Sequence, residues 1–287
     1  MSLGRLVIPL LTPFDNNLEI DYNSLAKHVD LLKYHVDNIF ILGTSGEWPC
    51  LNINEKIRLV EYVSNIYNPD RLVVGVHSIS LKDVYSMVRV CKDLSIKYII
   101  SLPPLYYKPT FRQFLRYYEE ICKIFDNMIL VYLYTNVQGY EVPVDWIFKL
   151  VYEYSNIVGF KITSRDFKYI LNILYSLKDV GRSVVVYIGN GYLALPFIEA
   201  GGYGVVDILL NIIPKIFRDI IHGNVGLYRE LLNIYNKLSG INLIRFCKSI
   251  LKFLNIYSSD NTRFISETVS EQLVKHVVNA YSRFLLV

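Results

Sequence analysis

Eight short apolar segments, separated by longer amphipathic stretches, constrain the fold more than any other feature of this sequence. Their apolar residues are continuous rather than alternating, which is typical of strands buried on both faces of a parallel sheet. The stretches between them have the apolar spacing of helices, so the sequence predicts that strands and helices alternate. The predicted strands are residues 6–11, 38–42, 71–76, 97–102, 128–134, 157–162, 183–188 and 203–208.

Eight strands and their helices within about 210 residues match the number and length of a (β/α)8 barrel. The alternative, an open doubly wound sheet, requires a G-x-G-x-x-G phosphate loop after an early strand, which the sequence lacks. We therefore predict an α/β fold, with a (β/α)8 TIM barrel over residues 1–222. We expect residues 223–287 to form C-terminal helices packed on the barrel. Asn54 and Ser80 are predicted helix N-caps.

Charge and hydropathy exclude two classes of partner. Thirty Lys and Arg residues against 26 Asp and Glu give a net charge of +4, without the basic block that follows a nucleic-acid backbone. Every apolar run is shorter than the roughly 20 residues of a membrane-spanning helix, and no signal peptide is recognisable. We therefore expect a cytoplasmic protein that binds neither nucleic acid nor membrane.

The cysteines and histidines indicate no metal. Four cysteines and five histidines are scattered along the chain without metal-ligand or redox spacing. His28 and His35 share one amphipathic segment, but their separation is not that of metal ligands. We expect the cysteines to be thiols of the core.

Catalytic groups of a barrel lie at the carboxyl ends of its strands, so the residues at those ends are informative. The second predicted strand is followed by Gly43, Thr44, Ser45 and Gly46. This segment is either an ordinary turn or a loop whose amide groups bind an anion.

The fifth and sixth predicted strands carry tyrosines and a lysine near their ends. Tyr132 and Tyr134 share one face of their strand, because strand side chains alternate. Lys161 lies inside an apolar strand, where it must either extend to solvent or lie in the barrel mouth with a lowered pKa. A neutral lysine beside a phenol has the chemistry to attack a carbonyl group.

Five motifs in order then resemble the dihydrodipicolinate synthase / N-acetylneuraminate lyase family of class I Schiff-base aldolases. The pattern is closest to that of the archaeal-type 2-keto-3-deoxygluconate aldolases. The motifs are GTSGE at 43–47, LYYKP at 105–109, GFKIT at 159–163, GNGYLALP at 189–196 and GGYGVVDILLNIIP at 201–214.

The resemblance implies a role for each matching residue. Lys161 would form a Schiff base with the C2 carbonyl of a 2-keto acid, and Tyr132 would be the general acid and base. This chemistry would require no cofactor. Thr44 would pass protons between Tyr132 and Tyr107, the latter reaching in from a neighbouring subunit of a homotetramer, a dimer of dimers. The residues implied to bind the substrate are Gly43, Ser45, Tyr134, Thr163, Gly189 and Val206.

Departures from the family pattern bear on the substrate. Dihydrodipicolinate synthases place an arginine five residues after the catalytic tyrosine to bind a second carboxylate, and this chain has Val137 there. The resemblance therefore favours cleavage of a 2-keto-3-deoxy sugar acid, such as 2-keto-3-deoxygluconate, to pyruvate and an aldehyde. Dihydrodipicolinate synthase and N-acetylneuraminate lyase remain alternatives. The altered segment YLYT at 132–135 also leaves open a non-catalytic relative that binds a keto acid.

Two further polar residues, Asp207 and His77, occupy candidate positions at the barrel mouth. Each has two interpretations, since it could bind a substrate hydroxyl or only support its neighbours. Lys108 and Arg112 likewise either meet a phosphate or belong to a solvated helix start.

Overall fold

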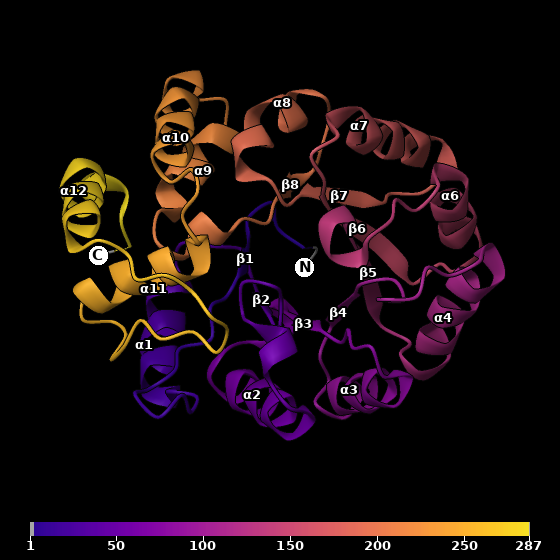
Figure 1. Ribbon diagram of the computed structural model, residues 1–287. Helices are drawn as coiled ribbons and strands as arrows, with labels where there is room; N and C mark the ends of the chain where they lie inside the picture. Colours follow the sequence, from indigo (N-terminus) through magenta and orange to yellow (C-terminus); the bar gives the residue numbers. More distant parts are fainter. Residues whose placement is uncertain (1–2, 287) are drawn as a thin grey trace.

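The computed structural model describes residues 3–286, and its eight parallel strands pair in sequence order. A parallel bridge between Leu6 and Val205 brings the last strand back to the first, which closes the barrel (Figure 1). The predicted (β/α)8 barrel is thus confirmed. The strands are β1 Val7–Pro9, β2 Asn38–Ile41, β3 Leu72–Gly75, β4 Tyr98–Ser101, β5 Met128–Tyr134, β6 Ile157–Thr163, β7 Val185–Ile188 and β8 Gly204–Val205.

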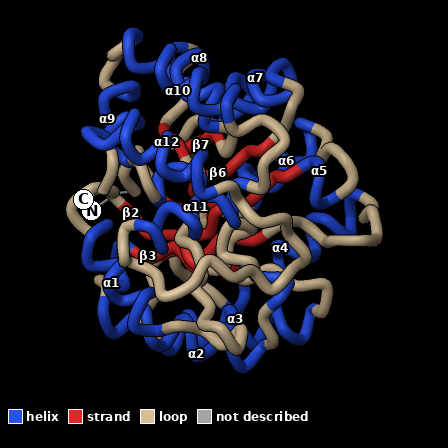
Figure 2. The backbone as a smooth tube through the Cα atoms, turned by 60° about the vertical axis from the view of Figure 1, so that its left-hand side comes forward, coloured by secondary structure: helices blue, strands red, loops and turns tan. Residues whose placement is uncertain are grey.

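Helices surround the strands on the outside of the barrel (Figure 2). The buried residues of each helix recur at helical spacing, so each helix has one apolar face, and this face packs against the strands. The helices between the strands are α1 Tyr22–Leu32, α2 Ile53–Ile66, α3 Leu81–Asp93, α4 Phe111–Ile124, α5 Thr135–Gln138, α6 Val144–Glu153, α7 Phe167–Ser176 and α8 Ala194–Glu199.

The N-caps of two helices test the sequence predictions. Ser80 caps α3, as predicted, and its hydroxyl accepts a hydrogen bond from the backbone N–H of Asp83. The prediction for Asn54 is wrong, because Asn52 caps α2. Asn52 has a glutamate three residues later, Glu55, and each side chain accepts a hydrogen bond from the other residue's backbone N–H.

The eighth strand is shorter than the predicted segment 203–208. The Asp207 side chain accepts a hydrogen bond from the backbone N–H of Leu209 at 2.9 Å, which caps a 3-10 helix over Ile208–Asn211. This cap ends the strand early and turns the chain away from the sheet.

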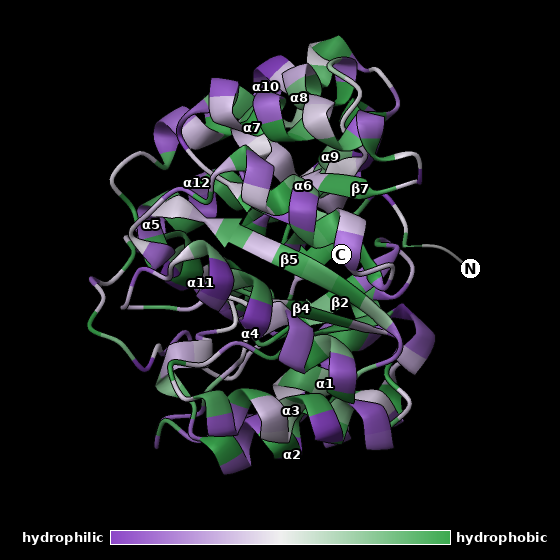
Figure 3. Ribbon diagram, turned by 90° about the vertical axis from the view of Figure 1, so that its right-hand side faces the viewer, coloured by the Kyte–Doolittle hydropathy of each residue, from purple (hydrophilic) through white to green (hydrophobic). Residues whose placement is uncertain are grey.

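The strands run through the hydrophobic core of the molecule (Figure 3). β5 points toward the side on which α5 and α11 lie, so this side holds the carboxyl ends of the strands (Figure 3). Large side chains such as Phe40 and Tyr187 are fully buried and fill the interior of the barrel. The barrel is therefore a packed scaffold, and chemistry belongs to its carboxyl end.

Four helices follow the eighth strand. They are α9 Pro214–Ile221, α10 Val225–Lys237, α11 Leu243–Phe253 and α12 Glu271–Tyr281. α10 packs against α9, and α11 packs against α12 and the 3-10 helix Ile208–Asn211. The division of the chain at 222/223 falls between α9 and α10 and stays a prediction. None of the helices within residues 3–286 is long and apolar enough to cross a membrane.

Candidate active site

A cavity of about 260 Å³ opens at the carboxyl ends of the strands. It brings together eight of the ten residues that the sequence predicted for the site. They are Thr44, Ser45, Tyr132, Tyr134, Lys161, Thr163, Gly189 and Val206. Gly43 and Tyr107 do not line it.

Lys161 lies on β6 and is 5% exposed. Its Nζ is 4.0 Å from the ring centroid of Tyr132 and 5.2 Å from that of Phe40. Burial lowers the pKa of Lys161 to about 7, and the nearby Asp207 carboxylate opposes this shift. Among residues 3–286, no side chain forms an ion pair or hydrogen bond with this ammonium group. A large share of the lysine is therefore neutral, and nucleophilic, near neutral pH.

Tyr132 is the cross-strand partner of Lys161, so both side chains face the same side of the sheet. A register shift between β5 and β6 near Ile129 and Leu130 precedes this pair. Burial raises the pKa of Tyr132 to about 12, and the hydroxyls of Thr163 and Thr44 lower it. The phenol is therefore protonated at neutral pH and can donate a proton.

The hydroxyl oxygens of Thr44 and Thr163 are buried near the Tyr132 hydroxyl, and neither makes a hydrogen bond of good geometry within the described chain. A buried hydroxyl without a partner carries a free-energy cost, which a ligand in the cavity can relieve. Tyr134, two residues beyond Tyr132, stacks on it with ring centroids 5.7 Å apart. These groups form one wall of the cavity.

Gly189 follows β7 and borders Lys161. A Cβ atom at this position would lie 2.0 Å from Thr163 Oγ1 and 3.2 Å from Lys161 Cε. Any side chain here would displace both residues, so glycine is required by the close approach of β7 to β6. Gly43 has a similar reason, since a Cβ atom there would lie 2.8 Å from the Phe40 ring.

Asp207, one of the two ambiguous polar residues, lines the cavity. Its carboxylate accepts hydrogen bonds from the backbone N–H groups of Gly191 at 2.8 Å and Leu209 at 2.9 Å. Burial raises the pKa of Asp207, while the Tyr235 hydroxyl, these amides and Lys161 lower it. The oriented carboxylate leaves lone pairs that can accept hydrogen bonds from a ligand.

His77, the other ambiguous residue, does not line the cavity. Its Nε2 lies 2.9 Å from the Leu42 carbonyl oxygen, and its ring packs edge-on against Trp48. Burial lowers the pKa of His77 to about 3, so the ring is neutral. His77 therefore supports the residues around it rather than touching a ligand.

Tyr107 lies on the surface and is 76% exposed. Its neighbour Tyr106 is 80% exposed and has a backbone φ of 70°, in the left-handed region that a tyrosine rarely adopts. Tyr107 and Lys108 border a separate hollow between α3 and α4, and Arg112 is exposed at the start of α4. Within one chain, none of these residues reaches the cavity.

Sequence reasoning missed several cavity residues. Asn190 belongs to the motif at 189–196, which is the signal that could have identified it. Tyr235, Leu243 and Ile244 come from α10 and α11, and their amphipathic patterns do not show which face meets the barrel. The complete set that the sequence did not predict is Pro9, Asn190, Gly191, Tyr192, Ile208, Tyr235, Leu243 and Ile244.

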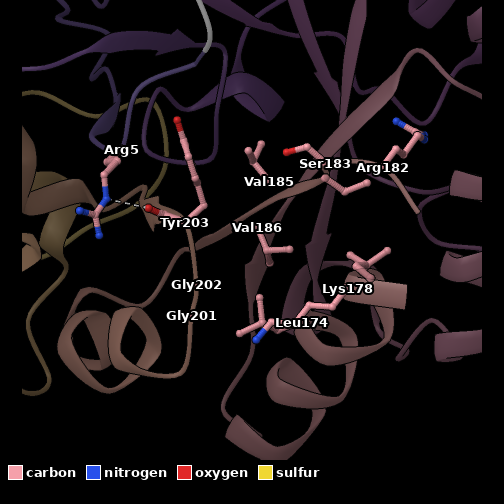
Figure 4. Close-up of a pocket in the computed structure, with 12 residues that line it drawn as sticks. Arg5, Leu174, Lys178, Arg182, Ser183, Val185, Val186, Gly201, Gly202 and Tyr203 are labelled. Carbon is pink, nitrogen blue, oxygen red and sulfur yellow. Dashed lines mark hydrogen bonds between the residues drawn. The ribbon is translucent and has the colours of Figure 1, made fainter. Parts of the chain in front are cut away.

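A second hollow, of about 370 Å³, lies at the amino ends of β7 and β8 (Figure 4). Arg5, Lys178 and Arg182 are its cations, and a guanidinium nitrogen of Arg182 donates to the carbonyls of Val151, Tyr154 and Ile157. Its lining has no acid–base pair comparable with Lys161 and Tyr132. The part of the chain that the structure describes also holds no cluster of three or more metal-ligating side chains.

Most of the chain matches one family of known proteins. The model of the dihydrodipicolinate synthetase family matches residues 2–259. A 4-hydroxy-tetrahydrodipicolinate synthase of Thermosipho melanesiensis is 28% identical over 233 residues, which cover 80% of this chain and 79% of that protein. An uncharacterized DapA-like lyase of Thermococcus onnurineus is 28% identical over 214 residues, covering 74% of this chain and 72% of that protein.

Solved structures share the fold over nearly the whole chain. YagE, a prophage protein of the dihydrodipicolinic acid synthase family from E. coli K12 solved with pyruvate, has a TM-score of 0.87 at 18% identity and covers 99% of both chains. CdNal from Clostridium difficile, solved with mannosamine, has a TM-score of 0.86 at 21% identity and covers 99% of this chain and 100% of that chain. The chain therefore belongs to the dihydrodipicolinate synthetase family and is a class I aldolase or lyase of that family.

Proposed function

We propose that this protein cleaves a 2-keto-3-deoxy sugar acid, such as 2-keto-3-deoxygluconate, to pyruvate and an aldehyde through a Schiff base on Lys161. The observation that carries the proposal is the buried Lys161 amine, 4.0 Å from the ring of Tyr132 and free of any ion pair in the described chain. The pyruvate complex of the YagE structure supports a keto acid as ligand.

The chemistry begins with the neutral amine. Lys161 Nζ attacks the C2 carbonyl, and loss of water from the carbinolamine leaves a protonated imine. A base then takes the proton of the C4 hydroxyl, the C3–C4 bond breaks, and its electron pair forms an enamine with the imine carbon. The aldehyde leaves, a proton adds to C3, and water hydrolyses the imine to release pyruvate.

Tyr132 is the general acid and base of this sequence, and its place beside Lys161 supports that role. Thr44 relays protons to it, and Thr44 and Ser45 bind the carboxylate of the keto acid. Thr163 and Tyr134 contact the substrate from the same wall, with Val206 opposite and Gly189 leaving the space that Lys161 needs. Gly43 serves indirectly, by allowing the loop to pass over Phe40.

The proton relay continues into a second subunit. Tyr107 is exposed in a single chain and reaches the Thr44 hydroxyl only from a neighbour, within a homotetramer built as a dimer of dimers. The left-handed backbone of Tyr106 makes this residue a second candidate for that role, because such strain concentrates at functional sites.

The far end of the cavity supports a hydroxylated aldehyde. Val137 is 41% exposed on α5 and does not line the cavity, and the described lining contains no arginine. The Asp207 carboxylate faces this space, so it repels a second carboxylate and accepts hydrogen bonds from hydroxyls. Most curated relatives are named 4-hydroxy-tetrahydrodipicolinate synthase, which keeps that reaction as the second candidate.

Borohydride trapping with pyruvate tests the proposal. We expect a stable adduct on the Lys161 peptide, read by mass spectrometry of the intact and digested protein. An aldehyde panel then separates the substrates, since uncharged hydroxylated aldehydes are expected to condense faster than an aldehyde with a second carboxylate. The reverse order would favour the synthase reaction. A folded protein that forms no adduct would be a non-catalytic relative.

A further inference from the structure

Glu47, the last residue of the motif at 43–47, is fully buried behind the loop that carries Thr44 and Ser45. Its Oε1 lies 2.5 Å from Lys248 Nζ, and neither side chain has any exposed surface. Its Oε2 accepts a hydrogen bond from the backbone N–H of Arg263 at 2.8 Å. Both partners belong to the C-terminal part of the chain, more than 200 residues away in sequence.

The backbone of Glu47 is tied directly to the loop. Its φ is 57°, a left-handed conformation, and its N–H donates to the carbonyl of Thr44 at 3.0 Å. The preceding carbonyl, of Gly46, accepts a hydrogen bond from Thr12 Oγ1 at 2.7 Å. A displacement of the Glu47 side chain is therefore transmitted to Thr44 through one hydrogen-bonded turn.

The C-terminal partners are themselves held in place. Lys248, on α11, also donates to the carbonyl of Asn261 at 2.8 Å. The Arg263 guanidinium contacts Glu55 of α2 at 2.6 Å, and Lys248 and Arg263 both stand over the Phe14 ring, at 4.3 and 4.6 Å. We call Glu47, Lys248 and Arg263 the latch. The latch thus joins the C-terminal part of the chain to the loop that follows β2.

We propose that the latch positions the Thr44–Ser45 loop for the carboxylate of the keto acid, so that its three residues control keto-acid affinity without touching the keto acid. The inference rests on the proposed function. A buried ion pair is weak evidence for stability but fixes geometry when its hydrogen bonds are satisfied, as they are here. Anion-binding groups need such support, because small displacements weaken them. Glu47, Lys248 and Arg263 are thus positioning residues.

The test compares a latch variant with a matched control. The double variant E47Q/K248M removes both buried charges together and leaves no charge unpaired, which favours folding. D260N removes the Asp260–Arg245 ion pair of the same C-terminal segment, which is not bonded to Glu47. The readouts are the pyruvate concentration that gives half-maximal borohydride trapping and the maximal trapping rate.

We expect the double variant to raise the half-saturating pyruvate concentration by about 10-fold and to change the maximal rate by less than about 3-fold. D260N is expected to leave both values within about 2-fold of wild type. A merely structural role would lower the amount of active protein and leave half-saturation unchanged. That result, in a folded double variant, would overturn the inference alone.

A second variant, E47D, tests the inference if the double variant fails to fold. E47D keeps both charges and shortens the side chain by one methylene group, which draws the loop toward Lys248. A raised half-saturation with a preserved maximal rate would support the latch, and wild-type half-saturation would overturn it. If wild-type protein forms no adduct with pyruvate, the proposed function and the latch both fall.

Discussion

Lys161 and Lys248 are both buried in this protein, and they differ in what surrounds their amines. Lys161 is 5% exposed and stands over Tyr132, whereas Lys248 is fully buried and stands over Phe14. Burial lowers the pKa of Lys161 to about 7 and that of Lys248 to about 8. Lys248 meets the Glu47 carboxylate and the Asn261 carbonyl, while Lys161 has no such partner in the described chain.

The comparison shows that burial alone does not make a nucleophile. The Glu47 carboxylate, at 2.5 Å, stabilises the charged form of Lys248, so that amine is held as an ammonium and its lone pair is not available. The Lys161 amine has only the more distant Asp207 and lies in a cavity that a carbonyl compound can enter. The chemical difference between the two lysines therefore arises from the Glu47 carboxylate and from access to the cavity.

The largest effect on activity is expected from replacing Lys161, the lysine that we propose to react. Replacing Lys161 with Ala removes the amine and is expected to abolish pyruvate trapping and to lower aldol cleavage by about 10⁴-fold or more. Intact-protein mass spectrometry and a pyruvate-release assay measure both. The control is E47Q/K248M, which should still form an adduct at Lys161. An adduct on Lys248 in the Lys161→Ala variant would contradict the contrast.

Stability is expected to respond in opposite directions at the two lysines. Lys248→Met leaves Glu47 buried without its partner and should lower the free energy of unfolding by about 3–5 kcal/mol. Lys161→Met removes a buried ammonium without a partner and should raise the free energy of unfolding by roughly 2–4 kcal/mol at pH 6. Urea titration of both variants measures these values. Changes of the same sign in the free energy of unfolding would contradict the difference between a paired Lys248 and an unpaired Lys161.

The variant Tyr132→Phe tests whether the Tyr132 phenol transfers protons during aldol cleavage. Loss of the phenol proton is expected to lower the rate of aldol cleavage by about 10²–10³-fold, the usual contribution of a general acid or base. The half-saturating pyruvate concentration should change little. Tyr134→Phe, at the ring stacked on Tyr132, is the matched control with an expected loss below about 10-fold. Equal losses of activity in both variants would show that Tyr132 is not the general acid or base.

The smallest expected effect is a pH dependence. The Lys161 amine is neutral above its pKa of about 7, so the trapping rate at low pyruvate should rise about 10-fold from pH 6 to pH 8. Tyr132, with a pKa of about 12, should cause no decline over that range. A flat profile would contradict the lowered pKa of Lys161.

The same lowered pKa has a consequence for stability. Between about pH 7 and 10.5 the unfolded chain binds a proton on Lys161 that the folded chain does not. The free energy of unfolding of the wild type therefore rises with pH over this range, as the cost of burying the Lys161 charge disappears. The difference in unfolding free energy between Lys161→Met and wild type should therefore shrink over that window. Urea titrations at pH 6, 8 and 9.5 measure it.

The sequence predicted the barrel because the barrel depends on local pattern, and it predicted eight of the cavity residues chiefly because their motifs resemble those of a known family. Continuous apolar runs mark strands buried on two faces, and strand ends such as those carrying Lys161 and Thr44 must then meet at one end of the barrel. The residues that it missed depend on tertiary packing. Nothing in the pattern of α10 or α11 shows that Tyr235 or Leu243 faces the cavity, or that Lys248 meets Glu47.

The register shift between β5 and β6 has a consequence for which side chain of β5 lies opposite Lys161. Ile129 pairs with Ile157, but Leu130 pairs with Gly159, so β6 holds one extra residue, Val158. If the pairing of Ile129 with Ile157 continued without the shift, Lys161 would pair with Leu133, and amine and phenol would lie on opposite faces of the sheet. The one extra residue, Val158, therefore determines that Tyr132, and not Leu133, lies opposite the buried amine.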